Sequence, residues 1–391
     1  MSSPFMTPLK KQIPINNMAD ETAARRHTPF KNGILNAVFN FGVVATRPAR
    51  RYFHAFIRSK FVISALSVLR SKSILVVAQK FTRNDKSRIG SYLREVFDPN
   101  LIRHINAAAV SGPCILSTTG LMGERYRANI NDHISWQTFA RGYFDLAPIA
   151  LGLLFNECFP GKIVIDVGAN VGTTSIPLAK VGITIIGIEA SPGVASDLSF
   201  NVSLNSPIPY SVINLAVTSP EVAARQPFLN LYAPPGNFGA SSLIEGWAGA
   251  TTKNRKIELS RLTTLDQIVQ FLKISGVSFI KMDIEGSEYD ALLGSQEVIS
   301  KEMPAVTFEW RPDVFAKAGG QKKSFLSLFP QSFKFFGVKA SITGERCLEI
   351  RTELFNETSP YENVLAISDN QVRSSGRLRE LIDSSRATVS F

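Results

Sequence analysis

A glycine-bearing turn lies near the middle of the chain, directly after a short apolar run. The run 162–167 carries Asp166 near its end, and Gly168, Asn170 and Gly172 follow within five residues. Glycines let a backbone approach a ligand closely because they lack a side chain. A strand that ends in an acid, followed by such a turn and a helical pattern, is typical of loops that hold nucleotide-type ligands.

An acidic residue stands where a loop of this kind needs one. Glu189 follows the next apolar run, 183–188, and lies 21 positions after Gly168. A carboxylate at the end of the second strand can accept hydrogen bonds from ribose hydroxyls. The predicted cofactor residues of this segment are Asp166, Gly168, Asn170, Gly172 and Glu189.

The glycine spacing favours one cofactor class. Dinucleotide-binding loops use G-x-G-x-x-G, but Asn170 occupies the place of the second glycine, and no Walker lysine follows. A short loop preceded by an acid suits S-adenosylmethionine, which carries no pyrophosphate, and Asp166 can support the loop or bind the methionine amine. Two alternatives stay open: an ordinary strand-to-helix turn with chance glycines, and an NAD-linked oxidoreductase.

A second group of charged residues follows the apolar run 277–282. Lys281, Asp283, Glu285 and Glu288 lie within eight residues, and such side chains cost too much free energy to bury unpaired. In the functional interpretation, Asp283 faces the methyl group or the amine of the cofactor. In the alternative interpretation, this is a solvated loop with a lysine–glutamate pair, and a helix begins at Glu288.

Glu309 offers a further carboxylate at the end of the run 304–310. An alcohol that accepts a methyl group must lose its proton, and a carboxylate within about 3 Å can take it. Asp283 is the first candidate for this base and Glu309 the second. The pair could instead hold Mg²⁺, but we expect no metal. Lys281 is expected to pair with Glu285 or Glu309.

Apolar runs alternate with helical patterns from about residue 160, and the helix 192–204 is one of these patterns. Strands alternating with helices predict an α/β fold with a mostly parallel sheet covered on both faces. Ligands bind beyond the carboxyl ends of such strands, where both charged groups lie. The expected strands are 162–167, 183–188, 211–217, 277–282, 304–310, 333–338 and 363–367.

A long insertion, 218–276, interrupts this alternation. It carries an expected strand pair, 226–232 and 255–262, and Thr264 is expected to cap the following helix. Long loops over the carboxyl edge of a sheet commonly carry substrate contacts. We therefore expect the insertion to lie over the active site.

Charge is distributed unevenly along the chain. Residues 1–110 hold 18 of the 43 basic residues and 5 of the 32 acidic ones, so the rest of the chain is nearly neutral although the whole carries +11. Basic residues alternate with aromatic and aliphatic residues over 47–80, which predicts an amphipathic helical segment, and 86–97 is a further expected helix. The segment 47–80 can pack on the body of the protein or contact an anionic membrane surface. Nucleic acid is not an expected partner.

Three scattered cysteines predict no disulfide framework. No secretory signal and no membrane-spanning run is recognised, so the expected location is the cytoplasm, with peripheral membrane contact as an option. The expected organisation is 1–46 as a flexible segment, 47–110 as a basic helical extension, 111–160 as a cap, 161–370 as the catalytic domain and 371–391 as a tail.

The segments VIDVGANVGTTS, IIGIEAS, FNVSLN, NLAVT and FIKMDIEGSEYDALLGS resemble the FkbM-type S-adenosylmethionine-dependent methyltransferase family. The resemblance runs from about 140 to 315 and continues weakly through YENVL at 361–365. It implies a class I, Rossmann-like methyltransferase domain with a seven-stranded sheet. It also implies O-methylation of a hydroxyl on a sugar, glycan or secondary metabolite.

The resemblance also assigns roles to residues. It places the cofactor against the glycine turn and Glu189, with Ala216 near the adenine. Asp283, Glu285 and Glu288 become the acids near the reaction centre, and Asp145 stands where family members often carry a glutamate. The predicted catalytic residues are thus Asp283, Glu285 and Glu309, and Asp283 is counted with the cofactor residues as well. A non-catalytic methyltransferase-like module at a membrane is the alternative from another functional class.

Overall fold

The structure is a computed structural model that describes residues 115–129, 132–233, 237–244, 256–312, 325–344 and 346–391. All of them belong to one unit, Lys60–Phe391. The expected segments 1–46 and 47–110, with their helices and the membrane contact proposed for 47–80, lie outside the described residues. No helix within the described ranges is long and apolar enough to cross a membrane.

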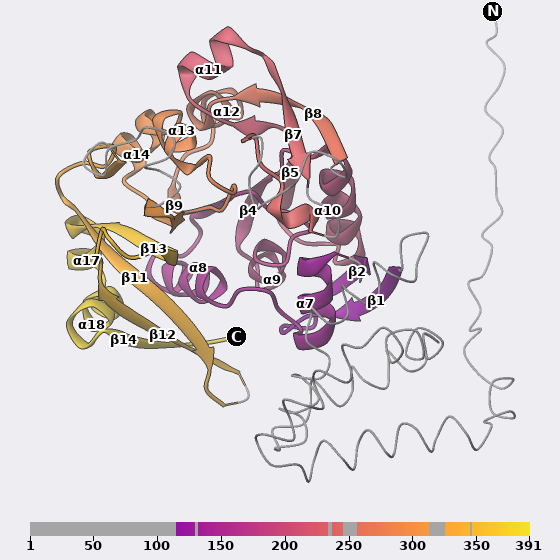
Figure 1. The fold of residues 1–391 in the computed structure, drawn as a ribbon. Coiled ribbons are helices and arrows are strands. Elements are labelled where there is room, and N and C mark those ends of the chain that lie inside the picture. Colours follow the sequence, from indigo (N-terminus) through magenta and orange to yellow (C-terminus); the bar gives the residue numbers. More distant parts are fainter. Residues whose placement is uncertain (1–114, 130–131, 234–236, 245–255, 313–324, 345) are drawn as a thin grey trace, which may run out of the picture. The chain divides into compact units, whose positions relative to one another are not determined.

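A nine-stranded sheet forms the centre of this unit, in the order β14-β12-β11-β13-β10-β9-β3-β4-β5 (Figure 1). Its strands are β3 (Ile163–Val167), β4 (Thr184–Ile188), β5 (Tyr210–Ile213), β9 (Val277–Met282), β10 (Ala305–Trp310), β11 (Phe333–Ile342), β12 (Cys347–Leu354), β13 (Tyr361–Ser368) and β14 (Arg386–Ser390). β10, β9, β3, β4 and β5 are parallel to one another. β13, β11, β12 and β14 continue the sheet through antiparallel pairs.

The α/β alternation is confirmed, but the expected mostly parallel, seven-stranded sheet is wrong. The sheet is mixed, and β12 and β14 extend it beyond the expected strands. β14 alternates exposed and buried residues along its whole length, as a strand with one solvated face does. The expected tail 371–391 therefore contains the last strand of the sheet, as well as α17 (Asp369–Ser374) in part and α18 (Gly376–Ser384).

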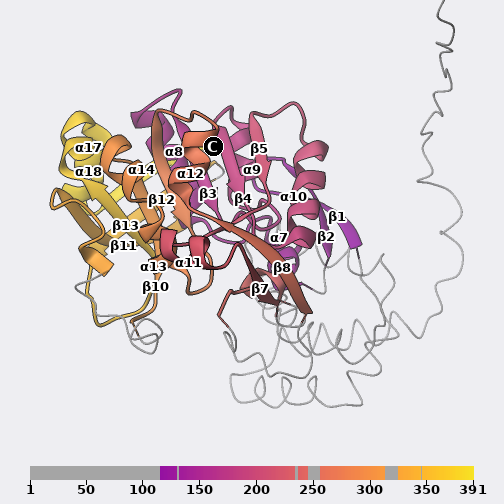
Figure 2. The same ribbon diagram turned by 90° about the horizontal axis from the view of Figure 1, so that it is seen from above.

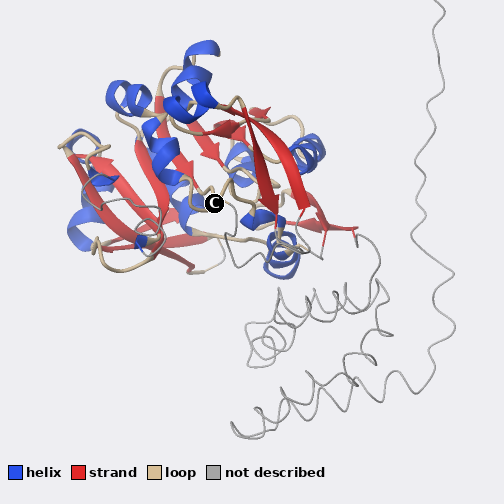
Figure 3. Ribbon diagram, turned by 45° about the horizontal axis from the view of Figure 1, so that its top comes forward, coloured by secondary structure: helices blue, strands red, loops and turns tan. Residues whose placement is uncertain are grey.

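Helices cover both faces of the sheet (Figure 3). One apolar core lies between the sheet and α8 (Ala147–Cys158), α9 (Ser175–Lys180) and α18. The other lies under α12 (Leu265–Phe271), α13 (Glu288–Leu293) and α14 (Gln296–Glu302). α10 (Pro192–Leu204), expected at these residues, packs beside α9 through Leu198 and Ile176.

α8 belongs to the core of the sheet domain and not to a cap. Its residues from Ala147 to Phe155 are all buried, and the helix packs against β9, β11, β12 and β14. A helix that is apolar all round needs a covered position. The expected cap 111–160 is therefore wrong for this part. Among the described residues, the hairpin β1 (Ile115–Thr119) and β2 (Arg125–Asn129) and α7 (His133–Arg141) precede α8.

An asparagine of α10 and the asparagine that follows its last residue hold that hairpin. The side-chain oxygens of Asn201 and Asn205 accept the amides of Arg127 and Arg125, each at 2.8 Å. The two residues lie four positions apart, so both face the same side of the helix. They satisfy backbone donors of β2 that no further strand reaches, which gives the asparagines of FNVSLN a structural role.

The insertion forms a separate small sheet, β6-β8-β7, seen with α11 (Pro220–Arg225) in Figure 2. β7 (Phe228–Ala233) and β8 (Lys256–Thr263) pair antiparallel, as expected. Thr264 caps α12 through a capping box with Gln267, also as expected. The short helix η1 (Phe238–Ala240) follows β7.

The expected strand 211–217 is in fact two strands. β5 ends at Ile213, and β6 (Ala216–Val217) pairs with β8 of the insertion sheet. Asn214 lies between them and donates its side-chain amide to the carbonyl of Glu189 at 2.7 Å. This contact ties the break in the strand to the end of β4.

Candidate active site

A pocket lies at the carboxyl ends of the parallel strands. β3 leads outward to β4 and β5, whereas β9 and β10 extend on its other side, so the pocket occupies the switch point where ligands bind in such sheets. Its lining residues are Val167, Gly168, Asn170, Ile188, Glu189, Ala190, Leu215, Ala216, Val217, Leu231, Gly239, Ser241, Leu243, Asp283, Ile284, Glu285 and Ser287.

Gly168 is the point where the glycine turn meets the charged loop after β9. Its φ is +78°, and an added Cβ would lie 1.9 Å from the carbonyl oxygen of Asp283. The amide of Asp283 donates to the carbonyl of Val167 at 3.1 Å. The two loops are therefore in backbone contact, and only glycine fits between them. Gly172 lies behind the turn, where its Cβ would meet Ile176.

Glu189 fastens the same turn from the end of β4. Its carboxylate accepts the amide of Asn170 at 2.9 Å and that of Ser191 at 2.8 Å. Burial raises its pKa to about 6, although both of these amides act to lower it. A carboxylate has about four acceptor positions, so Glu189 can still accept hydrogen bonds from a ligand in the pocket.

The insertion forms a wall of the pocket. Leu231 of β7 and Leu243 contribute apolar side chains, and Gly239 and Ser241 complete the edge. Ser242 fixes this wall to the charged loop, since its hydroxyl donates to the carbonyl of Glu285 at 2.8 Å. Ala216, expected near an adenine, lies on this apolar side of the pocket.

Lys281 does not pair with Glu285 or Glu309, so that expectation is wrong. Its ammonium nitrogen lies 3.1 Å from an oxygen of Asp166 and 3.6 Å from one of Asp283. The reason is the register of the sheet, because Asp166 and Lys281 are direct neighbours on β3 and β9. Residues two positions apart point to the same face of a strand, so Asp283, just after β9, follows Lys281 on that face.

Glu285 and Glu288 belong to a tight turn after β9. Glu285 has a φ of +54° and lines the pocket. Glu288 is 6% exposed, and its carboxylate accepts the amides of Ile284 and Gly286 at 3.1 and 3.3 Å. Burial, with the charges of Glu309 and Asp283, raises the pKa of Glu288 to about 7 despite these bonds. Glu288 thus shapes the turn, and α13 begins there.

Glu309 lies at the end of β10, outside the pocket lining. Burial raises its pKa to about 7, the negative charge of Asp283 adds to this effect, and Arg311 opposes it. Its side chain is 20% exposed and lies 3.7 Å from Arg311. The carboxyl group of Glu309 therefore lies beside the pocket, on the side away from Glu189.

Asp145 joins this acidic side from the segment before α8. One of its oxygens accepts the side-chain amide of Asn363 at 2.8 Å, and the other accepts the amide of Ala147 at 3.0 Å. Burial raises its pKa, and the charges of Asp283 and Glu362 also favour its protonated form. The contact links the Asp145 segment to the YENVL motif of β13.

The predicted site residues fall into two groups. Six of them line the pocket, namely Gly168, Asn170, Glu189, Ala216, Asp283 and Glu285. Asp166 is 1% exposed and lies beneath the loops, and Gly172 and Glu309 also lie outside the lining. Sequence reasoning missed Ser242, Asn214 and Asn363, because their partners come from distant parts of the chain and have no signal in the local pattern.

Within the described residues, no group of three or more His, Cys, Asp or Glu side chains is arranged to hold a metal ion. Of the carboxylates that line the pocket, Asp283 lies beside the ammonium group of Lys281.

Comparison with known proteins gives one specific match. The family model "Methyltransferase FkbM domain" matches residues 166–343. No curated protein matches the sequence.

Three of the solved structures that match this chain are the following methyltransferases. Methyltransferase FkbM from Methylobacillus flagellatus KT is 14% identical, with a TM-score of 0.30, over 77% of this chain and 60% of that one. The Pyrococcus abyssi tRNA (uracil-54, C5)-methyltransferase in complex with S-adenosyl-L-homocysteine is 13% identical, with a TM-score of 0.33, over 66% of this chain and 44% of that one. The O-methyltransferase from Bacillus cereus is 8% identical, with a TM-score of 0.30, over 56% and 79% of the two chains.

This chain thus spans 60% of the length of the first of these structures and 44% of the second. Because the identities and TM-scores are so low, these structures do not assign the chain to a family. The family assignment rests on the family model. The model begins at Asp166, includes the glycine turn, Glu189 and the charged loop after β9, and ends in the residues that follow β11. Residues 166–343 of the chain thus carry a methyltransferase FkbM domain, as the resemblance of the motifs predicted.

Proposed function

We propose that this protein is an S-adenosylmethionine-dependent methyltransferase that methylates a hydroxyl group of a sugar, glycan or secondary metabolite. The observation that carries the proposal is the pocket at the switch point between β3 and β9, where the glycine turn, Glu189 and Asp283 meet.

The two sides of the pocket suit the two ends of that cofactor. Leu215, Leu231 and Leu243 provide an apolar side for an aromatic base, and Glu189 lies beside it to accept ribose hydroxyls. Asp283 and Glu285 provide negative charge for the sulfonium and the amine. A pocket with a mostly apolar wall and a few convergent polar groups is typical of cofactor sites.

S-adenosylmethionine, when bound, supplies an already activated methyl group. The protein then has to hold the acceptor hydroxyl in line with it, and positioning alone can supply much of the rate. A base must also take the hydroxyl proton. Asp283 faces the pocket, but its carboxylate lies beside the ammonium of Lys281, whereas Glu309 has its pKa raised to about 7.

We infer that Asp283, which lines the pocket, is the first candidate for this base and that Glu309, at the end of β10 beside the pocket, is the second. The one that is not the base can orient the acceptor or the cofactor. The acidic side formed by Glu309, Asp283 and Asp145 also favours a neutral or cationic acceptor, since an anionic one would be repelled.

The test is calorimetric titration of S-adenosylmethionine and S-adenosylhomocysteine into the wild-type protein, Glu189→Ala and Glu353→Ala. We expect wild-type affinity of about micromolar order. Glu189→Ala should weaken it by about tenfold or more, because it removes a charged acceptor and frees the amide of Asn170. Glu353→Ala makes the same chemical change at an exposed position of β12 and should bind as the wild type does.

Absence of binding to folded wild-type protein would contradict the proposal. Enhanced NADH fluorescence on mixing with the protein would then favour the oxidoreductase alternative. When S-adenosylmethionine binds, acceptors can be screened by transfer of a labelled methyl group, first among neutral and amino-bearing glycans. Labelling of nitrogen or carbon only, and of no hydroxyl, would contradict the O-methylation part.

A further inference from the structure

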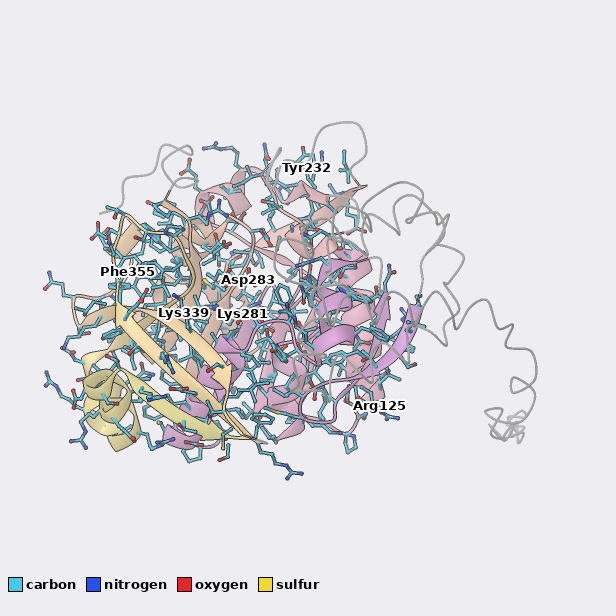
Figure 4. The ribbon with its side chains drawn as sticks, turned by 60° about the horizontal axis from the view of Figure 1, so that its bottom comes forward. Arg125, Tyr232, Lys281, Asp283, Lys339 and Phe355 are labelled. Atoms are coloured by element: carbon cyan, nitrogen blue, oxygen red, sulfur yellow. The ribbon has the colours of Figure 1, made fainter. Side chains whose placement is uncertain are left out.

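Lys281 connects the two loops of the candidate site. It lies on β9 between Ile280 and Met282 and is 6% exposed. Figure 4 shows it next to Asp283, near the centre of the labelled residues. A lysine is rarely buried unless charged partners surround it, so its partners indicate why it is there.

Three oxygens surround the ammonium group. It donates to the carbonyl of Gly168 at 2.8 Å, and it lies 3.1 Å from Asp166 and 3.6 Å from Asp283. An ammonium has three donors and no acceptor. The contacts are one hydrogen bond to the glycine turn and two ion pairs, one with the carboxylate beneath the turn and one with the charged loop.

Asp166 makes the positive charge necessary. It is 1% exposed, and among the described residues no group other than Lys281 lies close enough to donate a hydrogen bond to its carboxylate. Burial by itself would lower the pKa of Lys281, but Asp166 and Asp283 together raise it above the usual value. Lys281 thus remains charged throughout the pH range in which the protein works.

Asp283 differs from Asp166 because it reaches the pocket. Its side chain is 45% exposed and lines the pocket beside Gly168. One of its oxygens is held by Lys281, which leaves the other oxygen for a ligand. The ammonium thereby orients this carboxylate.

We propose that Lys281 is a positioning residue of the methyltransferase site: it holds the glycine turn and the carboxylate of Asp283 in the arrangement that binds the cationic end of the cofactor. This inference rests on the proposed function. It assigns to Lys281 neither contact with the cofactor nor a role as a base.

The experiment measures the affinity for S-adenosylmethionine at pH 7 in the wild type, Lys281→Met, Asp283→Asn and the double variant. Lys281→Met should bind about tenfold more weakly than the wild type, as expected for loss of a charged hydrogen bond.

If Lys281 acts through Asp283, adding Lys281→Met to Asp283→Asn should weaken binding by less than about threefold. A purely structural role would give effects of the two substitutions that add in full, and that result would overturn the inference.

Thermal unfolding of each variant shows whether it is folded. If Lys281→Met does not fold, Lys281→Gln combined with Asp166→Asn removes one charge of each sign, and Asp166→Asn alone is its control. This double variant should bind S-adenosylmethionine about tenfold more weakly than Asp166→Asn alone at pH 7. Equal affinities of the two proteins would overturn the inference. Failure of the proposed function looks different, because the wild type would then bind no S-adenosylmethionine at any pH.

Discussion

Gly168 and Asp283 show how two distant segments make one site. They lie more than a hundred positions apart in the chain, yet a Cβ on Gly168 would fall 1.9 Å from the backbone oxygen of Asp283. The amide of Asp283 in turn bonds to Val167. The position of the carboxylate is therefore set by the glycine turn, and a change in one loop must displace the other.

This contact predicts a large effect of Gly168→Ala. Gly123→Ala is the matched control, because Gly123 has nearly the same φ, +77°, with nothing within 4 Å of its added Cβ. The control should cost about 1 kcal/mol of unfolding free energy, the usual penalty for a left-handed alanine. Gly168→Ala should cost about 3 kcal/mol or more, since the clash adds to this penalty. Urea unfolding measures both, and equal costs would show that the loops can move apart.

The sequence was informative about these residues wherever the signal was local. The glycine turn, Glu189 and Asp283 all lie at the carboxyl ends of strands, and their positions follow from the alternation of strands and helices. The partner of Lys281 was predicted wrongly because it depends on the register between β3 and β9, which no local pattern reveals. Glu309 was predicted as a catalytic residue, but its acidic side chain lies beside the pocket and is not part of the lining.

At the scale of elements, Glu288 joins the charged turn to α13. It caps the turn with two backbone bonds although it is 6% exposed and its pKa is raised to about 7. The folded protein thus holds a proton at Glu288 between about pH 4.5 and 7 that the unfolded chain releases. Its contribution to stability is therefore lost as the pH rises through this window.

Glu288→Gln should remove this loss. Glutamine keeps an oxygen for the amides of Ile284 and Gly286 and carries no charge to bury. The variant should match the wild type at pH 5 and exceed it at pH 8 by about 1–3 kcal/mol, the energy of a shift of this size. Glu297→Gln, at the exposed start of α14, is the control. Unfolding by urea at both pH values measures the difference, and a less stable Glu288→Gln at pH 8 would contradict the argument.

Elements with a strong local pattern were predicted well, and elements at the margins of the domain were not. β3, β4, β9, β10, α10 and the pair β7–β8 all appear where alternation and turns indicated them. β12 and β14 were missed, since each alternates polar and apolar residues with few branched side chains in a row. α8 was placed in a cap because its neighbours in the sheet come from the far end of the chain.

The whole domain is larger than the segment that the family model matches. The model ends at residue 343, after β11, but β13 (Tyr361–Ser368) lies between β10 and β11 in the sheet. Without β13 the sheet would have a gap between those two strands. The residues after 343 therefore complete the fold that positions the pocket, and α8, before residue 166, covers their inner face.

The last strand tests this view of the domain. Val389 and Thr388 are neighbours on β14, with Val389 1% exposed in the core under α8 and Thr388 on the solvated face. Val389→Asp would bury a charge without a partner and should cost about 4 kcal/mol or more. Thr388→Asp introduces the same residue next to it and should stay within about 0.5 kcal/mol of the wild type. If urea unfolding gave similar small costs for both, the segment after 370 would be a dispensable tail. A large cost for Val389→Asp alone would make it part of the sheet domain.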